Sequence, residues 1–364
     1  MNKKILVAAV AAAMMAPSIA SADVKLYGIA QVEYNIEDRD GSDSVQSVDD
    51  DGVRSRIGVK SSEKLGGGLK AFGKFEWALD PADSNRSGIG DGLRARDQFV
   101  GLKSSWGSIA AGSFHAPYKT AGGVKWDPWT ATHLQARRAG GMAGGSGGIS
   151  GTNGFMRNTI YYTSPNVNGF KVQFAISPDE TNTGANNGDD DGDNDYSLAV
   201  QYKNGPWHAI FAHNRNNIAT ANTDDETLTK AGLRWKNGAW TLAGQYEVID
   251  DAAASAGGRA TGNASSGGNG YQVCSGCDAD IFWLNAQYKV GNNIFTASWG
   301  ETDVDRSGAS DYDHTYWAVG IIHKFSKKTR IFGGYTETDG DNDNPSVGGQ
   351  VDRDAFTVGI RKDF

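Results

Sequence analysis

The stretch Arg54-Ser55-Arg56-Ile57-Gly58-Val59-Lys60 decides the fold, because charged and apolar side chains alternate along it. Successive side chains of a β-strand point to opposite faces, so Ile57 and Val59 share one face. The basic residues Arg54, Arg56 and Lys60 share the other face. A strand of this kind separates an apolar medium from a polar one.

The same alternation recurs along the chain after residue 22. In residues 74–79, the apolar Phe75, Trp77 and Leu79 alternate with Lys74 and Glu76. Runs of about ten such residues, joined alternately by short turns and long polar loops, are typical of a transmembrane β-barrel. A Lys or Arg facing lipid at mid-bilayer would cost about 2–4 kcal/mol, so the charged side chains are expected to face the lumen.

The pattern predicts an all-β fold, a 16-stranded antiparallel transmembrane β-barrel. An even number of strands lets such a barrel start and end on the same side of the membrane. Short links at 106–107, 204–206, 236–238, 291–292 and 326–328 are expected as periplasmic turns, and the acidic segments 35–52, 177–194, 249–278 and 337–353 as extracellular loops. The expected strands are 24–34, 53–61, 69–79, 94–103, 108–115, 157–163, 169–177, 195–203, 207–214, 228–236, 239–248, 279–290, 293–301, 313–325, 329–336 and 354–364.

Residues 1–22 differ in kind from the rest of the chain. Lys3 and Lys4 precede an apolar run from Ile5 to Ala16, and the small residues Ala20-Ser21-Ala22 follow, which predicts a cleaved secretory signal. The apolar run is shorter than the roughly 20 residues that a spanning helix needs. We therefore expect an exported protein whose residues 23–364 form one barrel domain.

Charge and cysteine content limit the partners. The chain carries a formal net charge of −8, with acidic runs at 49–51, 189–195 and 339–343, and it has no basic face for nucleic acid. Cys274 and Cys277 have a Cys-x-x-Cys spacing, but no second ligand pair predicts zinc and no βαβ context predicts a redox site. In an exported chain, a local disulfide between them is favoured.

No motif indicates an enzyme, a metal or a cofactor. Residues 187–192 resemble the start of a calcium loop, yet Leu198 stands where a bidentate Glu is required. The glycine clusters lack the spacing of phosphate-binding loops, and neither HExxH nor Gly-x-Ser-x-Gly occurs. Two alternatives stay open: a lipolytic outer-membrane barrel, and a secreted calcium-binding β-sandwich adhesin.

Several stretches, in this order along the chain, carry a resemblance to a known family. They are Val24-Lys25-Leu26-Tyr27-Gly28, Arg56-Ile57-Gly58-Val59-Lys60, Gln98-Phe99-Val100-Gly101-Leu102, Trp106-Gly107-Ser108, Asn158-Thr159-Ile160-Tyr161-Tyr162-Thr163-Ser164-Pro165, Gly169-Phe170, Phe325-Ser326-Lys327-Lys328-Thr329 and Val358-Gly359-Ile360-Arg361-Lys362-Asp363-Phe364. The chain resembles the trimeric general porins of Gram-negative outer membranes, closest to their neisserial and β-proteobacterial branch.

The resemblance implies a homotrimer of barrels in outer-membrane lipid and lipopolysaccharide, each with a water-filled pore for passive diffusion of ions and small hydrophilic solutes. It also implies that the third extracellular loop, here from Ala116 to Met156, folds inward and narrows the channel. Phe364 occupies the place of the C-terminal Phe that the barrel-assembly machinery reads in this family.

The family also implies where the pore constriction lies. By position, Arg56 and Arg96 match basic residues of the barrel wall, and Glu76 matches a lumen acid. Alternation alone adds Arg54, Arg94 and Lys74 to the wall, while Asp127 is the one carboxylate of the loop. The same loop departs from the family in its excess of basic residues, which predicts weak anion selectivity. These loop residues are Lys119, Lys125, Arg137 and Arg138.

Overall fold

The computed structural model describes residues 23–39, 43–50, 54–79, 81–82, 94–138, 142–143, 154–178, 194–216, 225–252, 276–306, 310–340 and 352–364. The expected signal segment 1–22 and Cys274 lie outside these ranges. Within them, no helix combines the length and the hydropathy needed to cross a membrane.

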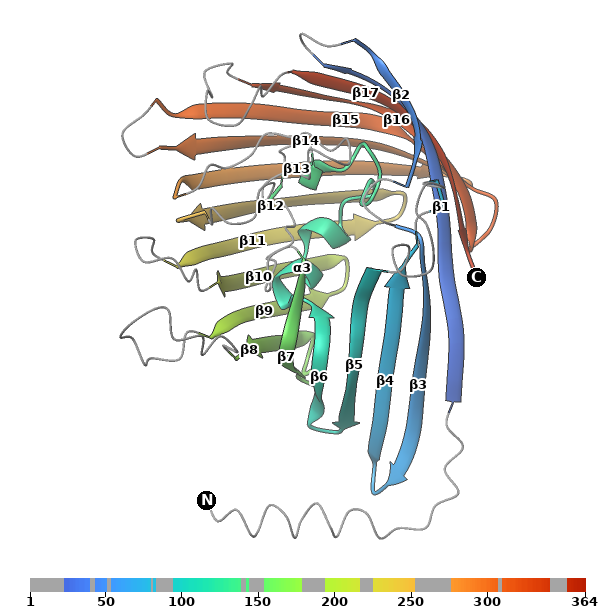
Figure 1. The fold of residues 1–364 in the computed structure, drawn as a ribbon, viewed down its shortest axis with the longest axis vertical. Coiled ribbons are helices and arrows are strands. Elements are labelled where there is room, and N and C mark those ends of the chain that lie inside the picture. The colour runs from blue at the N-terminus through green and yellow to red at the C-terminus, as the bar shows by residue number, and fades with distance from the viewer. Residues whose placement is uncertain are drawn as a thin grey trace.

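Sixteen antiparallel strands close into one barrel, and a seventeenth short strand lies beside the first (Figure 1). Closure occurs where β1 pairs with β17 along Ile29–Arg39 and with β3 along Asp23–Ile29. The prediction of a 16-stranded barrel is therefore confirmed. The strands are β1 (Asp23–Arg39), β2 (Val45–Asp49), β3 (Arg56–Gly66), β4 (Leu69–Ala78), β5 (Arg94–Ser104), β6 (Gly107–His115), β7 (Phe155–Thr163), β8 (Phe170–Ser177), β9 (Asp195–Asn204), β10 (Trp207–Asn216), β11 (Glu226–Asn237), β12 (Trp240–Asp250), β13 (Asp278–Val290), β14 (Asn293–Asp305), β15 (Tyr312–Lys324), β16 (Thr329–Gly340) and β17 (Arg353–Asp363).

The structure corrects several strand ends. β1 continues to Arg39, β14 to Asp305 and β16 to Gly340, each about four residues beyond the expected end. At these ends carboxylates, such as Asp38, Asp303 and Glu337, replace apolar residues on the outward face. The alternation of apolar and polar residues therefore stops while the backbone pairing continues. β2 was not expected, because its two valines, Val45 and Val48, lie on opposite faces and give no alternation, although the strand pairs with β1.

The outer face of the barrel is apolar. On β12 and β13, Leu242, Tyr246, Phe282 and Leu284 are each about 40–50% exposed, whereas the alternate residues are buried. Rows of exposed large apolar side chains are unfavourable in water and favourable against lipid. The faces thus follow the alternation that the sequence predicts.

The hairpin turns lie where they were expected. In the β3–β4 turn, Gly66, Gly67 and Gly68 all adopt positive φ angles, of 92°, 56° and 80°. Only glycine adopts such a run without strain. The short turns and the long loops lie at opposite ends of the barrel, and we call these the short-turn end and the long-loop end.

The segment after β6 occupies the inside of the barrel. It contains α3 (Pro117–Thr120) and two single 3-10 turns, η1 (Gly123–Lys125) and η2 (Ala136–Arg138), which lie within the curve of the sheet in Figure 1. Its hydrogen bonds reach three separate parts of the wall. They run from Tyr118 Oη to Glu247 on β12 (3.0 Å), from Gln31 on β1 to the Ala131 carbonyl (2.6 Å), and from Tyr316 on β15 to the Leu134 carbonyl (2.5 Å).

Glycines on the wall provide the room for this segment. Gly320 and Gly334 are direct partners on β15 and β16. A Cβ on Gly320 would lie 2.8 Å from the Trp129 indole, and a Cβ on Gly334 would lie 2.8 Å from Leu134 Cδ1. Trp129 and Leu134 are both fully buried. The loop is therefore anchored in a trough that only glycine leaves open, and we call this the glycine trough.

Candidate pore constriction

Glu76 on β4 is the centre of a charged cluster on the inner wall. Its Oε1 accepts from Arg96 Nε at 2.7 Å and lies 3.5 Å from Arg56 Nη1. Its Oε2 accepts from the Tyr27 hydroxyl at 2.8 Å and lies 3.1 Å from Lys74 Nζ. The carboxylate is 2% exposed, so its charge is compensated almost entirely by these four groups.

A β-bulge brings a second carboxylate into the lumen beside Glu76. The β4–β5 register shifts between Phe75 and Trp77, so Arg96 and Asp97 both turn inward although they are neighbours in sequence. Asp97 accepts from Lys74 Nζ at 2.6 Å and lies 2.7 Å from His115 Nδ1. Strict alternation would have placed Asp97 on the outer face, which is why the sequence did not predict it.

The loop carboxylate Asp127 has a local role. It accepts the backbone N–H of Trp129 at 2.9 Å and of Ala136 at 3.1 Å, so it holds two parts of the loop together. Burial raises the pKa of Asp127 to about 6, against the opposing effect of these two hydrogen bonds and of the nearby Arg137. That its charge faces the basic wall stays a prediction.

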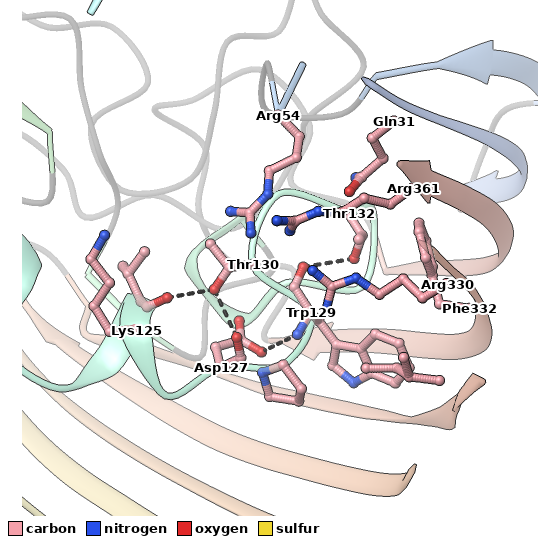
Figure 2. A pocket seen from close by; sticks show the side chains of 13 residues that line it. Gln31, Arg54, Lys125, Asp127, Trp129, Thr130, Thr132, Arg330, Phe332 and Arg361 are labelled. Atoms are coloured by element: carbon pink, nitrogen blue, oxygen red, sulfur yellow. Dashed lines mark hydrogen bonds between the residues drawn. The ribbon is translucent and has the colours of Figure 1, made fainter. Parts of the chain in front are cut away.

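A cavity of about 260 Å³ separates the loop from the wall formed by β1, β16 and β17. Figure 2 shows the guanidinium groups of Arg54, Arg330 and Arg361 close together over the loop residues Trp129 and Thr130. Lys125 lines the same space from η1. Arg361 is paired with Asp363 at 2.6 Å, whereas neither Arg54 nor Arg330 forms an ion pair with any residue that the structure describes.

Arg54 reaches this cavity by a turn and not by strand alternation. The expected strand 53–61 begins only at Arg56. The Asp50 carboxylate accepts hydrogen bonds from the backbone N–H groups of Arg54 and Ser55, both at 2.8 Å. These two residues therefore form a turn, and strand pairing begins only at Arg56. Arg330 and Arg361 were missed, although alternation along β16 and β17 places both on the inner face.

The remaining expected sites are placed only in part. Arg94 is the first residue of β5, but its side chain lies outside the described residues, as does that of Arg138. Cys277 is disulfide-bonded. Because Cys274 is not described, the pairing of the two stays a prediction. Glu301, Asp303 and Asp313 could bring ligand atoms within 4.8 Å of one another, but these outer carboxylates alone do not define a metal site.

The comparisons with known proteins agree with this architecture. A model of the Gram-negative porins matches residues 8–343. This chain belongs to the Gram-negative porin family. Major outer membrane protein P.IB of Neisseria gonorrhoeae is 28% identical over 348 residues, covering 90% of this porin and 91% of that protein.

Two solved structures share the fold. The anion-selective porin from Comamonas acidovorans has a TM-score of 0.74 at 21% identity, covering 94% of this chain and 100% of that one. OmpT of Vibrio cholerae, in a trimer form, has a TM-score of 0.62 at 15% identity, with coverage of 94% and 100%. The present chain is thus an outer-membrane porin, a channel for diffusion and not an enzyme.

Proposed function

We propose that this porin prefers anions, because two arginines that form no ion pair among the described residues line the cavity between the inward loop and the wall. Arg54, Arg330 and Lys125 surround the 260 Å³ cavity, and its one loop carboxylate, Asp127, is bound to backbone N–H groups. Fixed positive charge inside low-dielectric walls raises the local concentration of anions and lowers that of cations. Glu76 and Asp97 do not cancel this charge, since each is already paired with basic neighbours.

Replacing two of these arginines tests the proposal. In Arg54→Gln/Arg330→Gln, the anion-to-cation permeability ratio should fall about threefold, because the unpaired charges that concentrate anions are gone. The measurement is the reversal potential of the purified porin in a planar bilayer under a potassium chloride gradient.

The matched control is Arg215→Gln/Arg306→Gln. It also removes two charges, but Arg215 lies on the outer face of β10 and pairs with Asp225, and Arg306 lies beyond the end of β14. The control should keep the wild-type ratio. Cation preference in the wild-type porin would contradict the proposal outright.

We further propose that the mature porin begins at Asp23 after signal cleavage and assembles as a homotrimer surrounded by outer-membrane lipid and lipopolysaccharide. The trimer form of the Vibrio cholerae relative and the apolar outer face of the barrel support this assembly. Crosslinking in native membranes should yield a species of three subunits, and a monomer alone would contradict it.

A further inference from the structure

A group of lysines lies around the inner wall at the short-turn end, and one of them, Lys324, is the direct partner of Arg330 of the constriction cavity. On several strands an inward-facing residue near the turn is a lysine, and we call six of these the mouth lysines. They are Lys70, Lys103, Lys171, Lys203, Lys289 and Lys324. All but the half-buried Lys171 are exposed.

The strand registers show that these side chains face the lumen. Lys171 is the direct partner of Gln201, and Gln201 is the partner of Ile210. The Ile210 side chain faces the inward loop, because a Cβ on Gly122 would lie 2.9 Å from its Cγ1. Directly opposed residues share a face of an antiparallel pair, so Lys171 also points inward. Lys203 follows two residues after Gln201 and therefore shares that face.

Three of the mouth lysines lie opposite charges of their own sign. Lys70 is the direct partner of both Lys64 on β3 and Lys103 on β5, so three ammonium groups lie side by side. Lys324 is likewise opposite Arg330, which is opposite Arg361. Like charges at directly opposed positions destabilise a sheet. Within the described chain, none of the six lysines forms an ion pair.

The long-loop end of the lumen is built differently. There Arg353 lies 2.8 Å from Glu37, and Lys230 is the direct partner of Glu247. Basic and acidic groups are matched at these positions. At the short-turn end Arg361 is paired with Asp363, whereas the six mouth lysines form no ion pair with any described residue. The mouth lysines therefore add positive charge to the short-turn end of the lumen.

We propose that the mouth lysines form a second filter, which concentrates small anions at the short-turn mouth and makes the pore conduct asymmetrically. The inference rests on the proposed anion preference. Anions that enter through the lysine-lined mouth start from a higher local concentration than anions that enter from the long-loop end. Phosphate- and carboxylate-bearing solutes, which carry more than one negative charge, are concentrated more than chloride.

The test is the current of single porin channels at equal and opposite voltages in symmetric potassium chloride. At about 0.1 M salt the two currents should differ by about 1.5-fold, and at about 1 M they should become equal, because the screening length falls from about 10 Å to about 3 Å. This measurement uses the wild-type porin, so it tests the proposal even if a substitution impairs folding.

The variant Lys103→Gln/Lys171→Gln/Lys203→Gln should lose at least half of the asymmetry at low salt. Its matched control is Lys327→Gln/Lys328→Gln/Lys362→Gln, which removes as many charges at the same end of the barrel. Lys327 and Lys328 lie in the β15–β16 turn, and Lys362 is on the outer face, where it donates to Thr329 at 3.0 Å. The control should keep the asymmetry.

Symmetric wild-type currents at low salt, or equal losses in the two triple variants, would overturn the second filter. The reversal potential shows whether only the second filter fails or whether the proposed anion preference fails as well. Anion preference with symmetric currents leaves the constriction intact as the selective element, whereas cation preference removes both inferences.

Discussion

Glu76→Gln should destabilise the barrel by about 3–5 kcal/mol, since removing one partner leaves buried basic groups uncompensated. Arg96 and Glu76 are both buried, and three further donors converge on the same carboxylate. Glutamine keeps the size of the side chain, so the change isolates the charge. The free energy of unfolding in urea, measured in lipid vesicles, reports the effect.

Glu63→Gln is the control, because Glu63 lies on the neighbouring strand β3, faces outward opposite Ala71 and is only half-buried. It should change the free energy of unfolding by no more than about 0.5 kcal/mol. If the two variants proved equally stable, Glu76 would not be the centre of the charged cluster.

Trp129→Ala should release the inward loop and widen the pore. Truncating a fully buried tryptophan costs about 3–5 kcal/mol, and the lost contacts are those that fill the glycine trough on β15 and β16. With this anchor gone, the single-channel conductance should rise and its fluctuations should increase. The barrel strands pair independently of the indole, so heat-modifiable migration on gels should be retained.

Trp106→Ala is the matched truncation outside the lumen. Trp106 is 44% exposed and lies in the short turn between β5 and β6. The single-channel conductance of Trp106→Ala should equal that of the wild-type porin. An unchanged conductance in Trp129→Ala as well would mean that this loop does not narrow the channel.

The barrel was predictable from alternation because lipid and water impose opposite demands on neighbouring residues. Phe75 and Glu76 illustrate this, with 51% exposure outside and 2% exposure inside. Where the alternation of apolar and polar residues is lost, as in β2 and at the end of β1, the sequence no longer predicts the strand, although the backbone still pairs.

The candidate site was predictable only in part. Arg56, Lys74, Glu76 and Arg96 follow from parity and from the resemblance to porins, and the structure brings them together. The inward position of Asp97 could not be predicted from alternation, because a β-bulge shifts the register and turns two consecutive residues of β5 inward. The inward loop shows no alternation of apolar and polar residues that would predict its position. Its anchoring depends on glycines of the barrel wall that are distant in sequence.

The conductance of the purified porin in a planar bilayer tests the central claim most directly, namely that the lumen is a water-filled path past the loop. We expect stepwise current increases whose size grows with the salt concentration, as for ions that diffuse through water. If many insertions of folded protein left the bilayer silent, the loop would close the barrel and the diffusion pore would be contradicted.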